Sequence, residues 1–456
     1  MKRIDLKNKK TLVVGAGKTG TALAGFLVQK KAKVTVTDAA MPEELTDTAA
    51  ILSETGVQTV FGKHDPGLFC SFDLVILSPG VDPRIAPVQN ARAGGVTVIG
   101  EIELAARFIE SPIVCVTGTN GKTTVTRMIA AMLEKSGKSV FVCGNIGTPL
   151  ILAAQLSKQP DVVVVEVSSF QLDTTIDFCP AVAVLLNITE DHLDRYADFD
   201  AYAASKARIF ENQAEGDTAV VNAADRVVWG LVKDIKAEKC WFNDDSSKGC
   251  SAFVAGRDVI VRMGKTETFR ICCESFPLPG RHNLENISAA ALAALAAGAT
   301  QAGILEGLAG FTLDPHRIEY IAEINGVACY DDSKATNVDA VIKAVCAMPG
   351  SVILIMGGRD KGGGYERLLE TVGEKVRAFV LMGEAAEKIR RAIGGGKEIV
   401  FANNMEKAVD LGLKMARPGD SLLLSPACSS FDAYISYASR GEDFKQAVMT
   451  TKKGKK

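Results

Sequence analysis

A run of eight residues before the middle of the chain has the composition of a triphosphate-binding loop. Positions 117–124 read Thr-Gly-Thr-Asn-Gly-Lys-Thr-Thr and follow an apolar run at 113–116. In such a loop the backbone N–H groups face an anion, the lysine adds a positive charge and the hydroxyl after it can hold Mg²⁺. The usual pattern has glycine where this chain has Val116, but two glycines bracketing Thr-Asn are poorly explained by a plain strand-to-helix turn with a surface lysine. We predict a nucleoside triphosphate site made of Gly118, Thr119, Asn120, Gly121, Lys122, Thr123 and Thr124.

Two further polar groups follow apolar segments that read as buried strands. Glu166 ends the run at 162–165, and His192 follows the run at 181–186 within Asn-Ile-Thr-Glu-Asp-His-Leu-Asp. Ligands of open parallel sheets bind at the carboxyl ends of the strands, so an acid there is well placed for Mg²⁺. His192 could instead cap a helix at the surface; its place near Glu166 favours a metal or active-site role. Nothing in composition or spacing marks Lys206.

The first forty residues carry a second glycine-rich loop. Gly15-Ala-Gly-Lys-Thr-Gly20 lies between a strand at 11–14 and a helical pattern, and the next strand ends at Asp38. This spacing is the dinucleotide fingerprint and indicates NAD. The same backbone could hold another diphosphate, such as that of a UDP-sugar, and the motif does not separate the two.

The positioning elements predict three α/β domains. Short apolar strands alternate with helical patterns along the whole chain, which favours parallel sheets. We expect a Rossmann-like domain at 1–101, a central mononucleotide-binding domain at 102–314, and a Rossmann-like domain of parallel βα repeats at 315–456. A glycine-rich loop at 357–364 in the third domain could be part of a cleft or a flexible surface loop.

Composition excludes several classes of protein. The net charge of −2 argues against nucleic-acid binding, which needs a basic face. No signal peptide is recognisable, and the small-apolar run at 287–299 is too short to span a bilayer. Eleven cysteines without a C-x-x-C pair indicate reduced thiols. We expect a cytoplasmic protein without membrane partners.

Together these motifs resemble the Mur ligase family, ATP-dependent enzymes that join amino acids to UDP-muramoyl precursors of the cell wall. The resemblance spans nearly the whole chain. The phosphate loop has the form typical of this family, which explains why Val116 stands where the usual pattern has glycine. Residues 332–337 and 424–432 resemble the corresponding segments of the D-glutamate-adding members of the family. Phe431 and Tyr437 stand where leucine and phenylalanine are common. The matching segments are 117–124, 166–171, 187–195, 282–286, 315–317 with Glu319, 332–337 and 424–432.

The resemblance implies a reaction. ATP phosphorylates the L-alanyl carboxylate of UDP-N-acetylmuramoyl-L-alanine, and the amine of D-glutamate attacks the acyl phosphate. Lys122 and Thr123 would hold the triphosphate with one Mg²⁺. Glu166 and His192 would hold a second Mg²⁺ together with Lys206, which the resemblance implies is carbamylated and therefore anionic.

The resemblance also assigns the remaining contacts. Lys361 could alternatively be a solvated lysine beside three glycines. We expect small-molecule substrates and a monomer. The nucleotide would contact Asn286, Arg317 and Asp332; the UDP-substrate Thr19, Asp38, Gly80 and Asn145; and D-glutamate Lys334, Thr336, Lys361, Ser430 and Tyr437.

Two functions of other classes stay open at the level of sequence. One is an NAD-dependent enzyme built on the loop at 15–20, with the central loop as a second nucleotide site. The other is a nucleotide-binding regulatory protein without ligation chemistry. NADH binding would support the first, and ADP release that requires both an acceptor and an amino acid would exclude the second.

Overall fold

The computed structural model describes residues 3–145, 147–193, 195–243, 251–263, 267–273 and 280–454. Asp194 of the predicted motif at 187–195 lies outside these residues. The chain divides into two compact units, and each is described by itself. The first contains Met1–Asn187, Ala203–Ile271 and Ile287–Gly310, and the second contains Ile188–Tyr202, Cys272–Asn286 and Phe311–Lys456.

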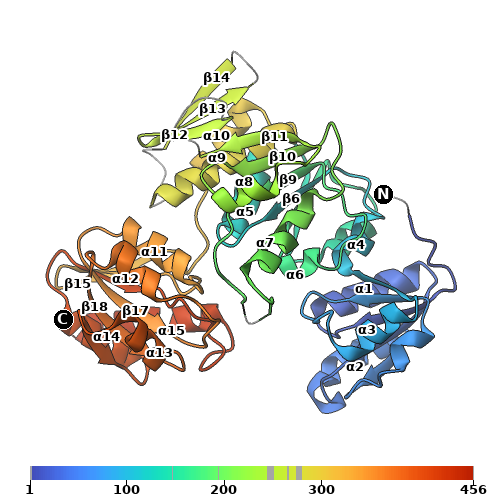
Figure 1. The fold of residues 1–456 in the computed structure, drawn as a ribbon, viewed down its shortest axis with the longest axis horizontal. Helices are drawn as coiled ribbons and strands as arrows, with labels where there is room; N and C mark the ends of the chain where they lie inside the picture. Colours follow the sequence, from blue (N-terminus) through green and yellow to red (C-terminus); the bar gives the residue numbers. More distant parts are fainter. Residues whose placement is uncertain are drawn as a thin grey trace. The chain divides into compact units, whose positions relative to one another are not determined.

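The N-terminal domain, drawn in blue in Figure 1, contains a five-stranded parallel sheet with strand order β3-β2-β1-β4-β5. From β1 the next two strands are added on one side of the sheet, and β4 and β5 are added on the other side. The loops after β1 and β4 therefore flank a topological switch point. The strands are β1 Lys10–Val14, β2 Lys33–Asp38, β3 Gln58–Phe61, β4 Leu74–Leu77 and β5 Thr97–Gly100. The helical segments are α1 Lys18–Gln29, η1 Pro42–Leu45, α2 Thr46–Glu54, η2 Leu68–Ser71, α3 Ala86–Ala93 and α4 Glu101–Ala106.

The central domain contains a nine-stranded sheet with strand order β14-β13-β12-β11-β10-β9-β6-β8-β7. β6 lies between β8 and β9 and runs parallel to both. An antiparallel hairpin, β12 with β13, extends the sheet. The strands are β6 Ile113–Thr117, β7 Val140–Gly144, β8 Val162–Glu166, β9 Val182–Leu185, β10 Thr218–Asn222, β11 Glu238–Phe242, β12 Ala252–Ala255, β13 Asp258–Met263 and β14 Glu267–Cys272. The helical segments are α5 Lys122–Lys135, η3 Leu150–Gln155, α6 Ser169–Leu172, α7 Phe199–Ala207, η4 Arg208–Phe210, α8 Arg226–Leu231, α9 Arg281–Ala296 and α10 Gln301–Ala309.

The C-terminal domain contains a six-stranded sheet with strand order β15-β16-β20-β17-β18-β19. The strands are β15 Glu319–Ile324, β16 Val327–Asp331, β17 Val352–Gly357, β18 Val376–Met382, β19 Glu398–Phe401 and β20 Ser421–Leu424. The helices are α11 Val338–Ala347, α12 Glu366–Val372, α13 Ala386–Ile393, α14 Met405–Met415 and α15 Tyr437–Gly454.

One edge of this sheet departs from the predicted parallel βα repeats. β15 pairs antiparallel with β16. The two strands are joined by Asn325 and Gly326, which have φ angles of 53° and 76°. An Asn-Gly pair with two positive φ angles is the preferred two-residue hairpin turn, because its twist matches that of the flanking strands. The sequence therefore carried a hairpin signal at this point that the parallel interpretation overlooked.

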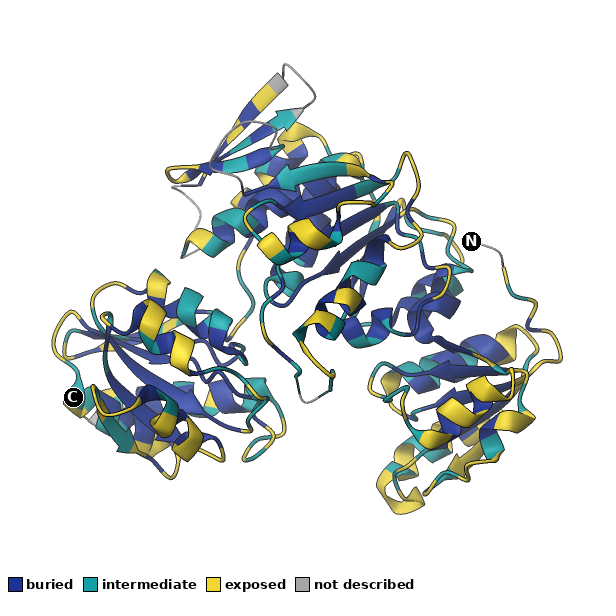
Figure 2. Ribbon diagram, in the orientation of Figure 1, coloured by how far each residue is buried: buried dark blue, intermediate teal, exposed yellow. Residues whose placement is uncertain are grey.

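Alternating strand residues build the core on both faces of the C-terminal sheet. In β17, Val352, Leu354 and Met356 pack with α11, α12 and α13, whereas Ile353 and Ile355 pack with α14 and α15. Side chains of a strand point alternately to opposite faces, so a strand that is apolar throughout must be covered on both. Figure 2 shows these central strands buried and the outer helix faces exposed.

The predicted three-domain α/β architecture is confirmed. The domain boundaries at 101 and 314 stay predictions. Within the described residues, no helix combines the length and apolarity needed to cross a bilayer.

Candidate active site

The predicted phosphate loop joins β6 to α5 in the centre of the sheet. Gly118 has a φ of 149°, and a Cβ there would lie 2.9 Å from the Cβ of Leu186. Gly121, with a φ of 88°, is the N-cap of α5. Both positions thus need glycine, one for close approach and one for backbone conformation. Lys122 and Thr123 begin the helix, where the first N–H groups lack intrahelical acceptors and attract anions.

Asn187, which follows β9, holds this loop in place. Its carbonyl accepts a hydrogen bond from the N–H of Thr119 at 2.8 Å. Its side-chain oxygen accepts from the N–H of Asn120 at 2.9 Å, and its amide donates to the carbonyl of Asn120 at 3.0 Å. The sequence comparison placed Asn187 in a matching motif but gave it no role. Its position just after the neighbouring strand β9 lets it fix the conformation of the loop.

Two lysine ammonium groups meet at one carbonyl of the loop. Lys122 Nζ lies 2.9 Å from the carbonyl oxygen of Gly118 and 2.8 Å from that of Thr119. Lys206 Nζ lies 2.9 Å from the same Gly118 oxygen, and its side chain is only 2% exposed. The lysine that composition did not mark therefore lies, buried, against the phosphate loop.

Glu166 lies at the end of β8, beside the loop. It is 1% exposed, and its Oε1 accepts a hydrogen bond from the side-chain amide of Asn145 at 2.8 Å. Its buried Oε2 has no hydrogen-bond partner within the described part of the chain. A buried carboxylate oxygen is unfavourable unless a donor or a cation satisfies it, so Glu166 fits a metal-binding role. Asn145, assigned by resemblance to the UDP-substrate, contacts this carboxylate.

His192 belongs to the second unit, with Asp191 beside it. The N–H of His192 donates to Asp191 Oδ1 at 3.0 Å, and its Nε2 lies 3.7 Å from Asp191 Oδ2. The metal set predicted from Glu166, His192 and Lys206 draws on both units and stays a prediction.

Two predicted D-glutamate residues lie together in the second unit. Lys361 Nζ is 3.3 Å from Thr336 Oγ1 and 3.3 Å from Asp191 Oδ1. The Lys361 side chain is 19% exposed, so it is not the solvated lysine of the alternative interpretation. One small pocket is lined by Glu190, Asp191, Leu193, Thr336, Asn337, Lys361, Gly362, Gly363 and Ala427.

The predicted nucleotide residues of the second unit are Asn286, Arg317 and Asp332. The amide of Asn286 donates to Asn283 Oδ1 at 3.3 Å. Asp332 Oδ2 accepts from the hydroxyl of Ser425 at 2.9 Å. Burial raises the pKa of Asp332 to about 7, against the hydrogen bond from Ser425 and the nearby charge of Arg317, which lower it. The N–H of Ile318, the residue after Arg317, donates to Asp332 Oδ1 at 3.3 Å, so the turn that carries Arg317 contacts Asp332.

Sequence reasoning missed Arg440, which connects the loops that carry the D-glutamate residues. It is 2% exposed, and its guanidinium donates to the hydroxyl and carbonyl of Ser333, each at 2.9 Å. It also donates to the carbonyls of Gly357, Cys428 and Ser429 at 3.4, 3.1 and 3.3 Å. Burial lowers the pKa of Arg440 to about 10. A signal was present, because Arg440 shares the buried face of α15 with Phe444, Ala447 and Val448 at helical spacing.

Tyr437 and Ser430 adjoin this group. Lys334 Nζ lies 3.8 Å from the centroid of the Tyr437 ring, a cation–π contact. The carbonyl of Tyr437 accepts from the hydroxyl of Ser333 at 2.8 Å. Ser430 is 2% exposed, and its carbonyl accepts from the N–H of Tyr434 at 2.9 Å. These residues start or precede α15, on which Arg440 lies.

In the N-terminal domain, Asp38 contacts the glycine-rich loop itself. Its Oδ2 accepts from the N–H of Ala16 at 2.7 Å, and its Oδ1 from the N–H of Ala40 at 2.9 Å. Thr19 lies in the first turn of α1, and Gly80 in the turn after β4. These predicted UDP-substrate residues therefore surround the switch point of the sheet, where ligands bind in open α/β folds.

Comparison with known proteins identifies the family. Family models match three segments: residues 9–100 match the Mur ligase MurD-like N-terminal domain, 116–294 the Mur ligase middle domain, and 316–428 the Mur ligase glutamate ligase domain. A UDP-N-acetylmuramoylalanine--D-glutamate ligase from Desulfosudis oleivorans is 48% identical over 454 residues, covering 100% of this chain and 99% of the relative. The chain belongs to the Mur ligase family.

Another relative and two solved structures agree with this family. A protein of the same name from Desulfatibacillum aliphaticivorans is 45% identical and covers 98% of this chain and 99% of its own. MurF from Acinetobacter baumannii is 17% identical with a TM-score of 0.65, covering 96% of this chain and 93% of that chain. A pseudomurein peptide ligase type C from Methanothermus fervidus is 20% identical with a TM-score of 0.62, covering 97% and 100%. Mur ligases are ATP-dependent and use Mg²⁺, so this chain is an ATP-dependent ligase.

Proposed function

We propose that this protein joins D-glutamate to UDP-N-acetylmuramoyl-L-alanine and converts ATP to ADP and phosphate. The observation that carries the proposal is the 48% identity, over the full chain, to a relative named for this reaction. The pairing of Lys361 with Thr336 in one pocket supports it, since these two residues are assigned to D-glutamate by resemblance.

The chemistry explains why ATP is needed. An amine does not displace oxide from a carboxylate at neutral pH, so the carboxylate first needs a leaving group. A carboxylate oxygen attacks the γ-phosphorus and ADP leaves, which gives an acyl phosphate. The amine of D-glutamate then attacks the acyl carbon, loses a proton and expels phosphate. Phosphoryl transfer needs positioning and charge neutralisation more than covalent help from the protein.

The phosphate loop supplies most of that positioning in the proposed mechanism. The N-terminus of α5 and Lys122 hold the triphosphate, and Asn187 keeps the loop in shape. Mg²⁺ would neutralise charge on the transferred phosphoryl group, with Thr123, Glu166 and His192 as its candidate protein ligands. The buried Glu166 oxygen without a partner among the described residues supports this assignment.

We propose that Lys206 acts as a carbamate rather than as an ammonium. A carbamate retains one N–H, which can keep the contact to the Gly118 carbonyl seen at 2.9 Å. Its oxygens would supply an anion of the kind that a divalent cation needs as a ligand. As a plain ammonium, Lys206 would place a cation next to the predicted metal.

The remaining assignments concern the other two substrates. Lys361 and Thr336 would hold one carboxylate of D-glutamate, and Ser430 with the segment around Tyr437 the other, with Lys334 nearby. The N-terminal loop would hold uridine diphosphate rather than NAD, because this domain matches a MurD-like model over residues 9–100. Since candidate residues for every substrate lie in this one chain, we propose that it acts as a monomer. The free thiols among the described cysteines support a cytoplasmic location.

The test is an ADP-release assay with substrates omitted one at a time. Release should require both UDP-N-acetylmuramoyl-L-alanine and D-glutamate, and L-glutamate should be a poor replacement. Pinning both carboxylates of the L-enantiomer turns its amine away from the acyl carbon. Equal use of the two enantiomers would refute the proposed site. NADH binding by the protein would instead favour the alternative of an NAD-dependent enzyme.

A further inference from the structure

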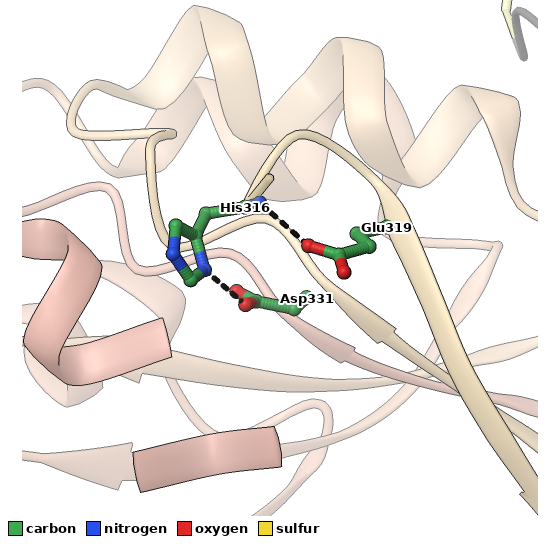
Figure 3. A group of neighbouring side chains, drawn as sticks. All are labelled: His316, Glu319 and Asp331. Atoms are coloured by element: carbon green, nitrogen blue, oxygen red, sulfur yellow. Dashed lines mark hydrogen bonds and ion pairs between the residues drawn. The ribbon is translucent and has the colours of Figure 1, made fainter. Parts of the chain in front are cut away.

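Three titratable side chains gather where the C-terminal domain begins (Figure 3). His316 Nδ1 lies 2.6 Å from Asp331 Oδ2, and the N–H of His316 donates to Glu319 Oε2 at 2.9 Å. Asp331, the last residue of β16, is fully buried, and His316 is 6% exposed. One ligand atom from each residue lies within 4.8 Å of the others, so the group has the spacing of a metal site.

The geometry favours a hydrogen-bonded pair over a metal site. Two ligands at about 2.1 Å from a tetrahedral metal lie roughly 3.4 Å apart, whereas the imidazole nitrogen and the carboxylate oxygen are separated by 2.6 Å. A cation is also already present, because Lys445 Nζ lies 3.0 Å from Glu319 Oε2. Imidazole N–H to carboxylate is a short, charge-assisted hydrogen bond.

The pair holds a turn with an unfavourable backbone. His316 and Ile318 have φ angles of 65° and 49°, in the left-handed region that β-branched residues such as isoleucine rarely adopt. Neither residue is glycine, so neighbouring contacts must maintain the turn. Such strain is concentrated at functional sites, and an observed outlier justifies a functional hypothesis. Between the two strained residues lies Arg317, the candidate nucleotide contact.

Asp331 connects this turn to the next loop. Its Oδ2 contacts His316, and its Oδ1 accepts from the N–H of Ser333 at 2.9 Å. The carbonyl of His316 in turn accepts from the N–H of Lys334 at 3.2 Å. Helix α15 packs directly on the pair, since a Cβ at Gly441 would lie 2.1 Å from His316 Nδ1 and 2.7 Å from Asp331 Oδ2. Asp331 is therefore the carboxylate that joins the His316 side chain to the loop at Ser333, in addition to the contacts that Glu319 and Lys334 make with the backbone of the turn.

We infer that Asp331 is a positioning residue for the nucleotide: through His316 it fixes the left-handed turn that presents Arg317 beside Asp332. The inference rests on the proposed function, in which Arg317 contacts ATP. Asp331 itself does not touch the substrate. Its removal should therefore change nucleotide affinity while leaving the UDP-substrate, whose candidate residues lie on other domains, unaffected.

The test measures ADP affinity by calorimetry alongside steady-state kinetics on the full-length protein. Asp331→Ala should weaken ADP binding and raise the KM for ATP by about ten- to a hundredfold, the usual effect of losing a hydrogen bond to a charged group. The KM for UDP-N-acetylmuramoyl-L-alanine should stay within about twofold. Asp331→Asn should recover most of the affinity, because its amide can still bond both the imidazole and Ser333.

A matched control separates positioning from stability. Asp420 is also a buried carboxylate of this domain, bonded to Arg377 at 2.8 and 3.0 Å, but it precedes β20 at the opposite end of the sheet. Asp420→Ala should lower the melting temperature and leave ADP affinity unchanged. Gly441→Ala, which keeps both side chains and separates the pair sterically, should reproduce the loss of ADP affinity if Asp331→Ala fails to fold.

The ADP affinities of the two variants and product formation by the wild-type protein separate failure of the inference from failure of the proposed function. If the wild-type protein forms ligase product but both Asp331→Ala and Gly441→Ala bind ADP within threefold of wild type, the inference is wrong. If the wild-type protein forms no product, the proposed function fails separately. Zn²⁺ or Mn²⁺ added to chelator-treated protein should not shift the melting temperature through Asp331. A shift seen in the wild type and absent in Asp331→Asn would overturn the inference in favour of a metal site.

Discussion

The phosphate loop and the loops of the C-terminal domain are two ways of building a binding site. The phosphate loop is one continuous segment between β6 and α5, and Asn187 and Lys206 bond to its backbone from outside the segment. The candidate D-glutamate residues come instead from loops after β16, β17 and β20. Arg440, on a helix that follows all of them, bonds to those same loops.

The two sites differ in which residues determine their conformation. A continuous loop carries its own conformation through its glycines and its helix, so each residue keeps its role locally. A site assembled from separate loops depends on a buried side chain that satisfies their carbonyls, because unpaired polar groups in the interior are unfavourable. A substitution in the phosphate loop should therefore affect the phosphoryl-transfer step alone. A substitution of the buried side chain in the D-glutamate site should disturb several contacts at once.

The largest expected effect is in the continuous loop. Lys122→Ala removes a cation from the transferred phosphoryl group and should lower kcat by about a hundredfold or more, as losses of such stabilisation do. Lys135→Ala, an exposed lysine at the other end of α5, should be near wild type. Near-normal ADP production by Lys122→Ala would show that this loop does not carry the chemistry.

The second largest effect is expected at Lys206, the buried lysine that bonds to the phosphate loop. Lys206→Ala should be nearly inactive and partly rescued by added acetate, which can replace a carbamate anion. Lys206→Arg should stay inactive, because a guanidinium keeps its positive charge at any accessible pH. Turnover with and without these additions is the measurement. Full activity of the arginine variant would mean that no anion is needed at this position.

A smaller effect is expected in the assembled site. Lys361→Ala should raise the KM for D-glutamate by about ten- to a hundredfold, the cost of one charge-assisted contact. The KM values for ATP and the UDP-substrate should change little. Lys388, an exposed lysine bonded to Asp360 of the same glycine-rich loop, provides the control variant Lys388→Ala. An unchanged KM for D-glutamate in Lys361→Ala would remove this residue from the site.

The smallest effect tests the positioning residue of the assembled site. Arg440→Lys keeps the charge but has three donors in place of five, so it cannot reach all the carbonyls that the guanidinium contacts. We expect a several-fold rise in the KM for D-glutamate, with no change for the UDP-substrate. If both substrates were affected equally, Arg440 would serve overall stability and the contrast between the two regions would disappear.

The same contrast explains what the sequence could predict. The strands around the phosphate loop are recognisable because they are short, apolar and bounded by glycine turns, and the loop is a contiguous motif. Lys206 and Lys361 required resemblance, because a single lysine on a helix or in a glycine-rich loop has no local signature. Arg440 and Asp331 were not found at all. The apolar face of α15 indicates that Arg440 is buried. Which distant backbone groups surround Arg440 and Asp331 is a property of the folded chain.

The most direct test of the account follows the oxygen atoms of the reaction. UDP-N-acetylmuramoyl-L-alanine labelled with ¹⁸O in its carboxylate is incubated with ATP, D-glutamate and the wild-type protein, and the inorganic phosphate is analysed by mass spectrometry. We predict one ¹⁸O atom transferred to phosphate for each D-glutamyl product formed, because the phosphate leaves from the acyl carbon with a carboxylate oxygen. Product accompanied by unlabelled phosphate, or label-free phosphate released without product, would contradict the account.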